Sequence, residues 1–209
     1  MKIWLDTIDF HLIADGVQRG VVFGITTNPS ILFAEKSVLK TLEKLLAIQE
    51  GPVAAQIVSE NVETMIEEGR LFSSLSPRVY VKVPITRNGL AAINQLQREG
   101  IPIMGTGVLY VSQALLAAHL NTAYMALYFS RIAGEAGDPF STLKTIVDMY
   151  RTNRFQTKIL VASIKQLDHL LYCASLGVDA VTIKADVYEA LIADKPMVTN
   201  ILQNFLKKI

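Results

Sequence analysis

A lysine stands in the middle of an otherwise apolar, β-branched segment. Lys82 is the central residue of RVYVKVPIT, residues 78–86, and valines precede and follow it. Because side chains alternate along a strand, Lys82 shares one face with Tyr80 and the valines share the other. On an exposed edge strand such a lysine protects the edge from pairing. In a closed sheet it must instead be paired, desolvated or used in catalysis.

A desolvated lysine can do carbonyl chemistry. A solvated lysine has a pKa near about 10.4 and is protonated at neutral pH, whereas burial in an apolar site lowers the pKa and favours the free amine. The free amine attacks a ketone and forms a Schiff base, and the resulting iminium withdraws electrons from the neighbouring carbon–carbon bond. This is aldol chemistry without a metal, and it also needs a group that moves protons.

The segments around Lys82 decide which interpretation holds. Stripes of helical period separate short β-rich segments: one follows the N-cap pair Asp138 and Pro139, and others cross residues 62–72 and 88–100. The predicted strands cover residues 2–6, 21–26, 53–58, 79–84, 101–108, 123–129, 158–164 and 179–184.

Strands that alternate with helices predict a parallel sheet, because parallel neighbours need a crossover. Eight such units within 209 residues predict a single (β/α)8 TIM barrel domain, residues 1–209. A doubly wound open sheet is the alternative, but no Gly-x-Gly-x-x-Gly fingerprint follows the first predicted strand. In a closed barrel there is no edge strand, which favours a buried role for Lys82.

The carboxyl ends of barrel strands are where chemistry is expected. One inward position near each such end is polar: Asp6, Thr26, Gln56, Lys82, Thr106, Tyr128, Ser163 and Thr182. The inward positions below them are apolar or small: Trp4, Ala54, Met104, Ala126, Val161 and Ala180. A polar ring above an apolar interior predicts a site at the barrel mouth.

Most of these residues also have an ordinary structural interpretation. Asp6 is where an aspartate commonly caps a first helix, and threonine and tyrosine are normal strand residues. Gln56 is harder to explain in this way, because a buried amide needs hydrogen-bond partners.

The chain resembles the small, single-barrel members of the transaldolase and fructose-6-phosphate aldolase family. The resemblance covers essentially the whole chain, and TTNPS together with the VKVP lysine is highly specific. Its landmarks occur in the family's order: WLDT, GITTNPSIL, VYVKVPIT, GLAAINQLQREGIP, MGTGV, YFSRI and VASIK.

The resemblance implies that Lys82 forms the Schiff base and that Asp6 assists proton transfer. Asn28 would bind hydroxyls of the ketose, and Thr26 belongs with it to substrate binding. The family implies sugar phosphates as substrates and neither a metal nor a cofactor.

Gln56, Thr106 and Tyr128 match the positions that hold a catalytic water. Aldolases of the family resemble one another in having Gln and Tyr where transaldolases tend to have Glu and Phe. Gln56 and Tyr128 therefore indicate the aldolase subgroup, which releases dihydroxyacetone and glyceraldehyde 3-phosphate from fructose 6-phosphate. Leu127, where a proline often stands, departs from the pattern.

Arg131 and Ser163 match the positions that contact the substrate phosphate. Arginine suits phosphate geometry, and Ser163 precedes a predicted helix at residues 165–174. The alternative for Arg131 is a surface arginine on a long loop. Lys184 stands where the last strand of the family usually ends in proline, and it adds a cation near the mouth.

Composition narrows the classes of partner and of metal site that are expected for this chain. A formal net charge of +1 without long charged runs argues against nucleic acid and a polybasic membrane patch. The single cysteine, Cys173, excludes an internal disulfide and the usual thiolate zinc sites, and the three histidines are scattered. Without a signal peptide pattern or a charge-free apolar window, a reducing, cytoplasmic setting is expected.

The last segment predicts self-association. Residues 196–209 begin a new helix at Pro196, with Val198, Ile201, Leu202, Phe205 and Ile209 along one side. The predicted barrel is complete before this helix, so its apolar stripe needs another surface. Small members of the family form pentamers that can pair into decamers, which implies that this helix packs on a neighbouring subunit.

Three functions are compatible with the sequence: the aldolase, a transaldolase that transfers a dihydroxyacetone unit between sugar phosphates in the pentose phosphate pathway, and a sugar-phosphate-binding barrel without catalysis. Asp6, Lys82, Thr106 and Tyr128 argue against the third, because binding alone does not need a buried amine.

Overall fold

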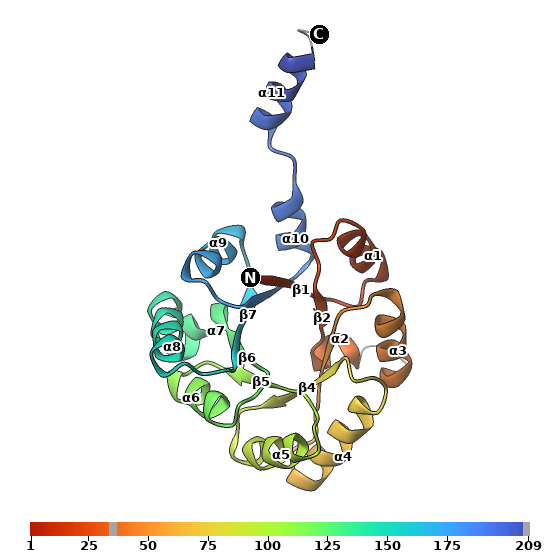
Figure 1. Ribbon diagram of the computed structural model, residues 1–209, viewed down its shortest axis with the longest axis vertical. Helices are drawn as coiled ribbons and strands as arrows, with labels where there is room; N and C mark the ends of the chain where they lie inside the picture. The colour runs from red at the N-terminus through yellow and green to blue at the C-terminus, as the bar shows by residue number, and fades with distance from the viewer. Residues whose placement is uncertain (34–36, 207–209) are drawn as a thin grey trace.

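A computed structural model of the chain describes residues 1–33 and 37–206. Its eight parallel strands close in chain order into a barrel, with helices around the outside (Figure 1). The predicted (β/α)8 barrel is confirmed. The strands are β1 (Lys2–Asp6), β2 (Gly24–Thr26), β3 (Val53–Gln56), β4 (Val79–Pro84), β5 (Ile103–Val108), β6 (Tyr124–Tyr128), β7 (Lys158–Ile164) and β8 (Ala180–Ile183).

The crossovers between these strands are helical. No helix in the described part of the chain has the length and apolar character of a membrane span. The helices are α1 (Phe10–Gln18), α2 (Pro29–Leu32), α3 (Val38–Ile48), α4 (Val62–Ser73), α5 (Arg87–Arg98), α6 (Val111–His119), α7 (Phe129–Glu135), α8 (Pro139–Asn153), α9 (Leu167–Leu176), α10 (Ala185–Ile192) and α11 (Pro196–Leu206).

The N-cap residue of α8 is the one predicted from the sequence, whereas the N-cap residue of α1 is not. The Asp138 carboxylate accepts hydrogen bonds from the N–H groups of Phe140 and Ser141, as expected of an N-cap. Helix α1 is capped by Asp9, whose carboxylate accepts from the backbone N–H groups of the first turn. Asp6 therefore does not cap this helix, and its carboxylate remains available at the barrel mouth.

The strands separate two apolar cores. The valines of β4 face the outer core, between the strands and the helices. The inner core fills the barrel, where the Trp4 ring meets the rings of Phe23, Tyr80 and Tyr124 edge-on, with centroids 5.4–6.2 Å apart. Such edge contacts stabilise a packed interior layer, which forms the floor beneath Lys82.

The prediction that Val161 faces the interior is wrong. Val161 packs in the outer core, and Leu160 and Ala162 face inward instead. The alternation breaks at Ser163, whose φ is +59°, and the register between β7 and β8 shifts between Val161 and Ile164. A bulge of this kind changes which face a side chain meets, so Ala162 and Ser163 both reach the mouth.

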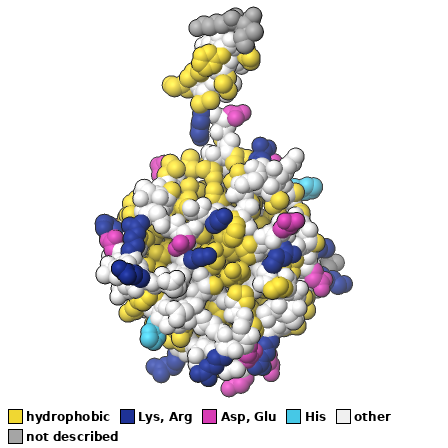
Figure 2. Space-filling model, in the orientation of Figure 1, with side chains coloured by type: hydrophobic (Ala, Val, Ile, Leu, Met, Phe, Trp, Pro, Cys, Tyr) yellow, Lys and Arg dark blue, Asp and Glu magenta, His cyan; other side chains and the backbone are white. Residues whose placement is uncertain are grey.

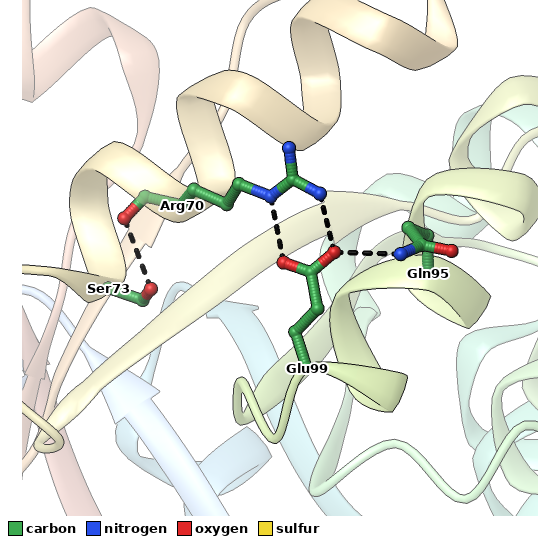
Figure 3. A network of polar contacts seen from close by, with 4 residues as sticks. All are labelled: Arg70, Ser73, Gln95 and Glu99. Carbon is green, nitrogen blue, oxygen red and sulfur yellow. Dashed lines mark hydrogen bonds and ion pairs between the residues drawn. The ribbon is translucent and has the colours of Figure 1, made fainter.

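Helices α4 and α5, which flank β4, are joined on the outside of the barrel by an ion pair (Figure 3). Arg70 donates from Nε and Nη2 to the two carboxylate oxygens of Glu99, at 2.8 and 2.6 Å, and Gln95 donates to the same carboxylate. This contact lowers the pKa of Glu99 to about 2. The bidentate geometry fixes the two helices relative to each other.

Helix α11 begins at Pro196 as predicted and extends away from the barrel (Figure 1). None of its residues is buried, and its apolar side chains form a cluster on the protruding segment (Figure 2). Phe205 is 59% and Met197 75% exposed. Ile209, the last residue of the predicted stripe, lies outside the described residues.

The inner core predicts the effect of removing its largest side chain. We expect Trp4→Ala to lower the free energy of unfolding by about 3–5 kcal/mol, because a fully buried aromatic ring leaves a cavity in the barrel. Leu171→Ala is the control; its side chain is 52% exposed, and the expected change is below about 0.5 kcal/mol. Urea denaturation measures both, and equal losses would contradict this description of the core.

Candidate active site

The carboxyl ends of the strands open into a cavity of about 410 Å³. Eight of the predicted site residues line it, and the ninth, Thr106, donates a hydrogen bond to one of them, Tyr128. All nine are thus brought together. The eight lining residues are Asp6, Thr26, Asn28, Gln56, Lys82, Tyr128, Arg131 and Ser163.

Lys82 is the buried cationic side chain of this cavity. It is 4% exposed, and its Nζ donates a hydrogen bond to the backbone carbonyl of Thr27 at 2.6 Å. Burial lowers the pKa of Lys82 to about 8, while the negative charge of Asp6 partly opposes this shift. A pKa near this value leaves roughly a tenth of the amine unprotonated at pH 7, compared with less than about 0.1% for a solvated lysine.

A web of side chains holds the Asp6 carboxylate. One of its oxygens accepts from Thr26 Oγ1 at 2.9 Å, and the other accepts from Asn28 Nδ2 at 3.3 Å. Thr26 Oγ1 also lies 2.7 Å from Thr182 Oγ1. Because the single proton of Thr26 points to the carboxylate, Thr182 is the donor in the second bond. Thr26 and Asn28 directly, and Thr182 through Thr26, thus fix the position of Asp6 beside Lys82.

Asn28 also starts helix α2. Its Oδ1 accepts from the N–H of Ile31 at 3.2 Å, which turns its Nδ2 group toward Asp6. The cap therefore orients an amide N–H₂ group into the cavity, where its second proton can meet a hydroxyl group.

Three further polar groups meet across the barrel. Thr106 Oγ1 donates to the Tyr128 hydroxyl at 3.1 Å, and that hydroxyl donates to Gln56 Oε1 at 3.5 Å. The half-buried Gln56 amide thereby has a hydrogen-bond partner for its oxygen. The contact between Tyr128 and Gln56 is long, and the cavity lies in front of it. These three polar side chains can therefore also hold a water molecule.

Arg131 and Ser163 lie on the β6–β7 side of the cavity. Arg131 is exposed but belongs to helix α7, directly after β6, so it is not a loop arginine. Its guanidinium carbon lies 5.5 Å from the centroid of the Tyr128 ring, a cation–π distance. The bulge at Ser163 turns this residue to the cavity, and the following helix, predicted at 165–174, is α9. Both side chains can therefore reach an anion at the mouth.

Sequence reasoning missed several parts of the site. The Thr27 carbonyl that accepts from Lys82 has no signal in residue type, and Leu160 and Ala162 line the cavity because of the Ser163 bulge. An adjoining cleft of about 600 Å³, mostly apolar, shares Pro29 and Gln56 with the cavity.

Within the described chain, no group of three or more His, Cys, Asp or Glu side chains could hold a metal ion.

Comparisons with known proteins agree with this geometry. Residues 3–208 match the family described as Transaldolase/Fructose-6-phosphate aldolase. The chain is 36% identical to a probable transaldolase of Phenylobacterium zucineum and 35% identical to one of Aquifex aeolicus. Each alignment covers 99% of this chain and 95% of the relative.

A match to the family over nearly the whole chain, at this level of identity, accompanies the expected barrel and a buried lysine at its mouth. The chain belongs to the transaldolase/fructose-6-phosphate aldolase family, and it is an enzyme of carbohydrate metabolism that acts on sugar phosphates as an aldolase or a transaldolase.

Proposed function

We propose that the chain is a Schiff-base aldolase that reversibly cleaves fructose 6-phosphate to dihydroxyacetone and glyceraldehyde 3-phosphate through Lys82. The observation that carries this proposal is the Thr106–Tyr128–Gln56 cluster beside a buried lysine of lowered pKa. A hydroxyl group in that position can protonate a carbanion and hold water, which release of dihydroxyacetone requires.

In the first half of the reaction the free amine of Lys82 attacks C2 of the ketose. Its hydrogen bond to the Thr27 carbonyl uses an N–H and leaves the nitrogen lone pair for the attack. Asp6, held by Thr26 and Asn28, transfers protons as the carbinolamine forms and loses water to give the iminium. Arg131 and Ser163 bind the phosphate and fix the other end of the substrate.

In the second half the C3–C4 bond breaks and its electrons pass to the iminium, which becomes an enamine. The C4 hydroxyl loses its proton to the water at the Tyr128 cluster, and glyceraldehyde 3-phosphate leaves. Tyr128 then supplies a proton to C3, and water adds to the restored iminium and releases dihydroxyacetone from Lys82. Gln56 and Thr106 position both Tyr128 and the water.

A transaldolase is the alternative within the family. It would keep the enamine on Lys82 until an acceptor aldose phosphate arrives, and the relatives described above are named probable transaldolases. A hydroxyl that can protonate the enamine favours release over transfer, which supports the aldolase. A barrel that only binds sugar phosphates does not agree with membership of an enzyme family.

A reducing, cytoplasmic setting is part of the proposal. Cys173 is free and buried, and burial raises the pKa of its thiol to about 12. Such a thiol is inert and needs no oxidising compartment to pair it.

We also propose that α11 packs on a neighbouring copy in a pentamer or decamer. Its large apolar side chains, Val198, Ile201, Leu202 and Phe205 among them, are 46–75% exposed, and none is buried against its own barrel. An apolar face of this extent is stable in water only when another surface covers it.

Lys82 is expected to form the covalent intermediate, with a rate set by its lowered pKa. Incubation with dihydroxyacetone and cyanoborohydride should add the donor's reduced mass at Lys82. The rate should rise about tenfold from pH 7 to pH 9 and then level off, because the amine is mostly unprotonated above pH 8. Surface lysines labelled in the same sample are the reference and should continue to gain reactivity beyond pH 9. Label at another lysine, or full activity in Lys82→Ala, would contradict the mechanism.

Tyr128 is expected to determine cleavage. The enzyme should release glyceraldehyde 3-phosphate from fructose 6-phosphate without an acceptor, and Tyr128→Phe should lower this rate by at least about tenfold, because the proton donor is lost. Combined with Gln56→Glu, it should shift the remaining activity toward transfer. Coupled detection of glyceraldehyde 3-phosphate, with and without erythrose 4-phosphate, measures both reactions. If the unmodified enzyme releases none until erythrose 4-phosphate is added, the transaldolase replaces the aldolase.

Removal of α11 is expected to break the assembly and leave the barrel folded. Light scattering should give a pentamer or decamer for the full chain and a smaller species for a chain ending at Asp194. The melting of the truncated barrel itself should be retained, because no residue of α11 is buried against it. A full chain that is monomeric at micromolar concentration would refute the proposed assembly.

A further inference from the structure

Lys184 lines the same cavity as the proposed catalytic residues, and the mechanism above does not use it. Its side chain is exposed and makes no hydrogen bond or ion pair with residues 1–33 or 37–206. It also borders a neighbouring cavity of about 400 Å³, which Asp6 and Ile31 line as well. Lys184 is therefore a cation at the mouth without a partner in the described chain.

The balance of charged side chains around the cavity allows Lys184 to bind an anion. The lining holds three basic side chains, Lys82, Arg131 and Lys184, and one carboxylate, Asp6. Thr26 and Asn28 already occupy that carboxylate, and Lys82 must be neutral to act as a nucleophile. Arg131 and Lys184 thus remain as two positive charges. A phosphate monoester carries a charge of roughly −1.5 to −2 at neutral pH, which one arginine does not balance.

The order of the strands brings these cations to one side of the mouth. Arg131 follows β6, Ser163 is the last residue but one of β7, and Lys184 follows β8. Strand β7 pairs with both β6 and β8. Ser163 therefore lies between the two cations around the rim. The loops after the seventh and eighth strands are where barrels of this architecture frequently bind phosphate.

The backbone of Lys184 is held in place while its side chain stays in solvent. Lys184 is the N-cap of α10, and its carbonyl accepts from the N–H of Tyr188 at 3.0 Å. Tyr188 is fully buried, and its hydroxyl donates to Asp15 on α1. Because its backbone is fixed, the long cationic side chain of Lys184 can reach the mouth of the barrel without a rearrangement of the fold.

We propose that Lys184 is a second cationic ligand for the substrate phosphate, on the opposite side of Ser163 from Arg131, and that it sets the preference for phosphorylated over unphosphorylated substrates. The inference rests on the proposed function for its substrate. Its physical basis is the pairing of one phosphate dianion with two cations that face the same cavity.

Lys184→Met tests the proposal through a difference between two substrates. In the direction of synthesis, KM for glyceraldehyde 3-phosphate should rise about fivefold or more, while KM for unphosphorylated glyceraldehyde and kcat for both stay within about twofold. Lys184→Arg should retain most of the phosphate preference. Lys40→Met is the matched control, because Lys40 is an exposed lysine of α3 outside the lining of the cavity.

Binding of inorganic phosphate, followed by ³¹P NMR, separates this inference from the catalytic proposal. Its Kd should rise by a similar factor in Lys184→Met and should not change in Lys40→Met. If phosphate binding depends on Lys184 while no cleavage or transfer occurs, the proposed function fails and this inference stands. Unchanged KM and Kd in Lys184→Met would overturn the inference, and so would an equal loss of affinity for both aldehydes.

Discussion

The closure of the sheet is the constraint on which the rest of the site depends. In an open sheet Lys82 could reach water at an edge, and its amine would stay protonated. Because β4 is paired on both sides and lies between two apolar cores, Lys82 is 4% exposed and its pKa falls to about 8. The fold thus converts an ordinary lysine into an amine that can attack a carbonyl group.

A buried amine of this kind needs neighbours that do not hold it in its protonated form. Asp6 lies near enough to raise the pKa of Lys82 slightly, but its oxygens are occupied by Thr26 and Asn28, and Thr182 supports Thr26 from β8. The carboxylate is therefore fixed beside the amine, where it can exchange protons with a bound substrate. Fixed polar groups of this type need no reorganisation during the reaction.

Irregular backbone at the rim of the barrel shapes the side of the site opposite Asp6. The strands β5 and β7 both lose regular register near their carboxyl ends, at Gly107 and Ser163, where φ is positive. Glycine adopts this conformation freely, whereas serine does so rarely, so the conformation of Ser163 is maintained by its surroundings. The result is a serine turned to the mouth between the cations of α7 and of the β8–α10 junction.

The parts of this protein that depend on local pattern could be predicted from the order of its amino acids. Short β-rich segments predicted the strands, helical period predicted the helices between them, and the closed barrel that this order implies predicted a buried Lys82. Residue types at the strand ends predicted seven of the nine site residues, and the family resemblance added Asn28 and Arg131. Eight of the nine line one cavity, and Thr106 is hydrogen-bonded to Tyr128 in its lining. The predicted bounds were less accurate than the order of the elements: of the strand predicted at residues 21–26, only Gly24–Thr26 is a strand.

The contacts that join distant segments follow from the closed fold and could not be predicted from local pattern. The bond between Thr26 and Thr182 spans 156 residues, and the Thr27 carbonyl that meets Lys82 is a backbone group present at every position. The inward face of β7 was predicted one residue out of phase at Val161, because the positive φ of Ser163 is not a property of serine. Hydrogen bonds across a barrel and strained backbone depend on the whole closed sheet, and residue type carries no record of them.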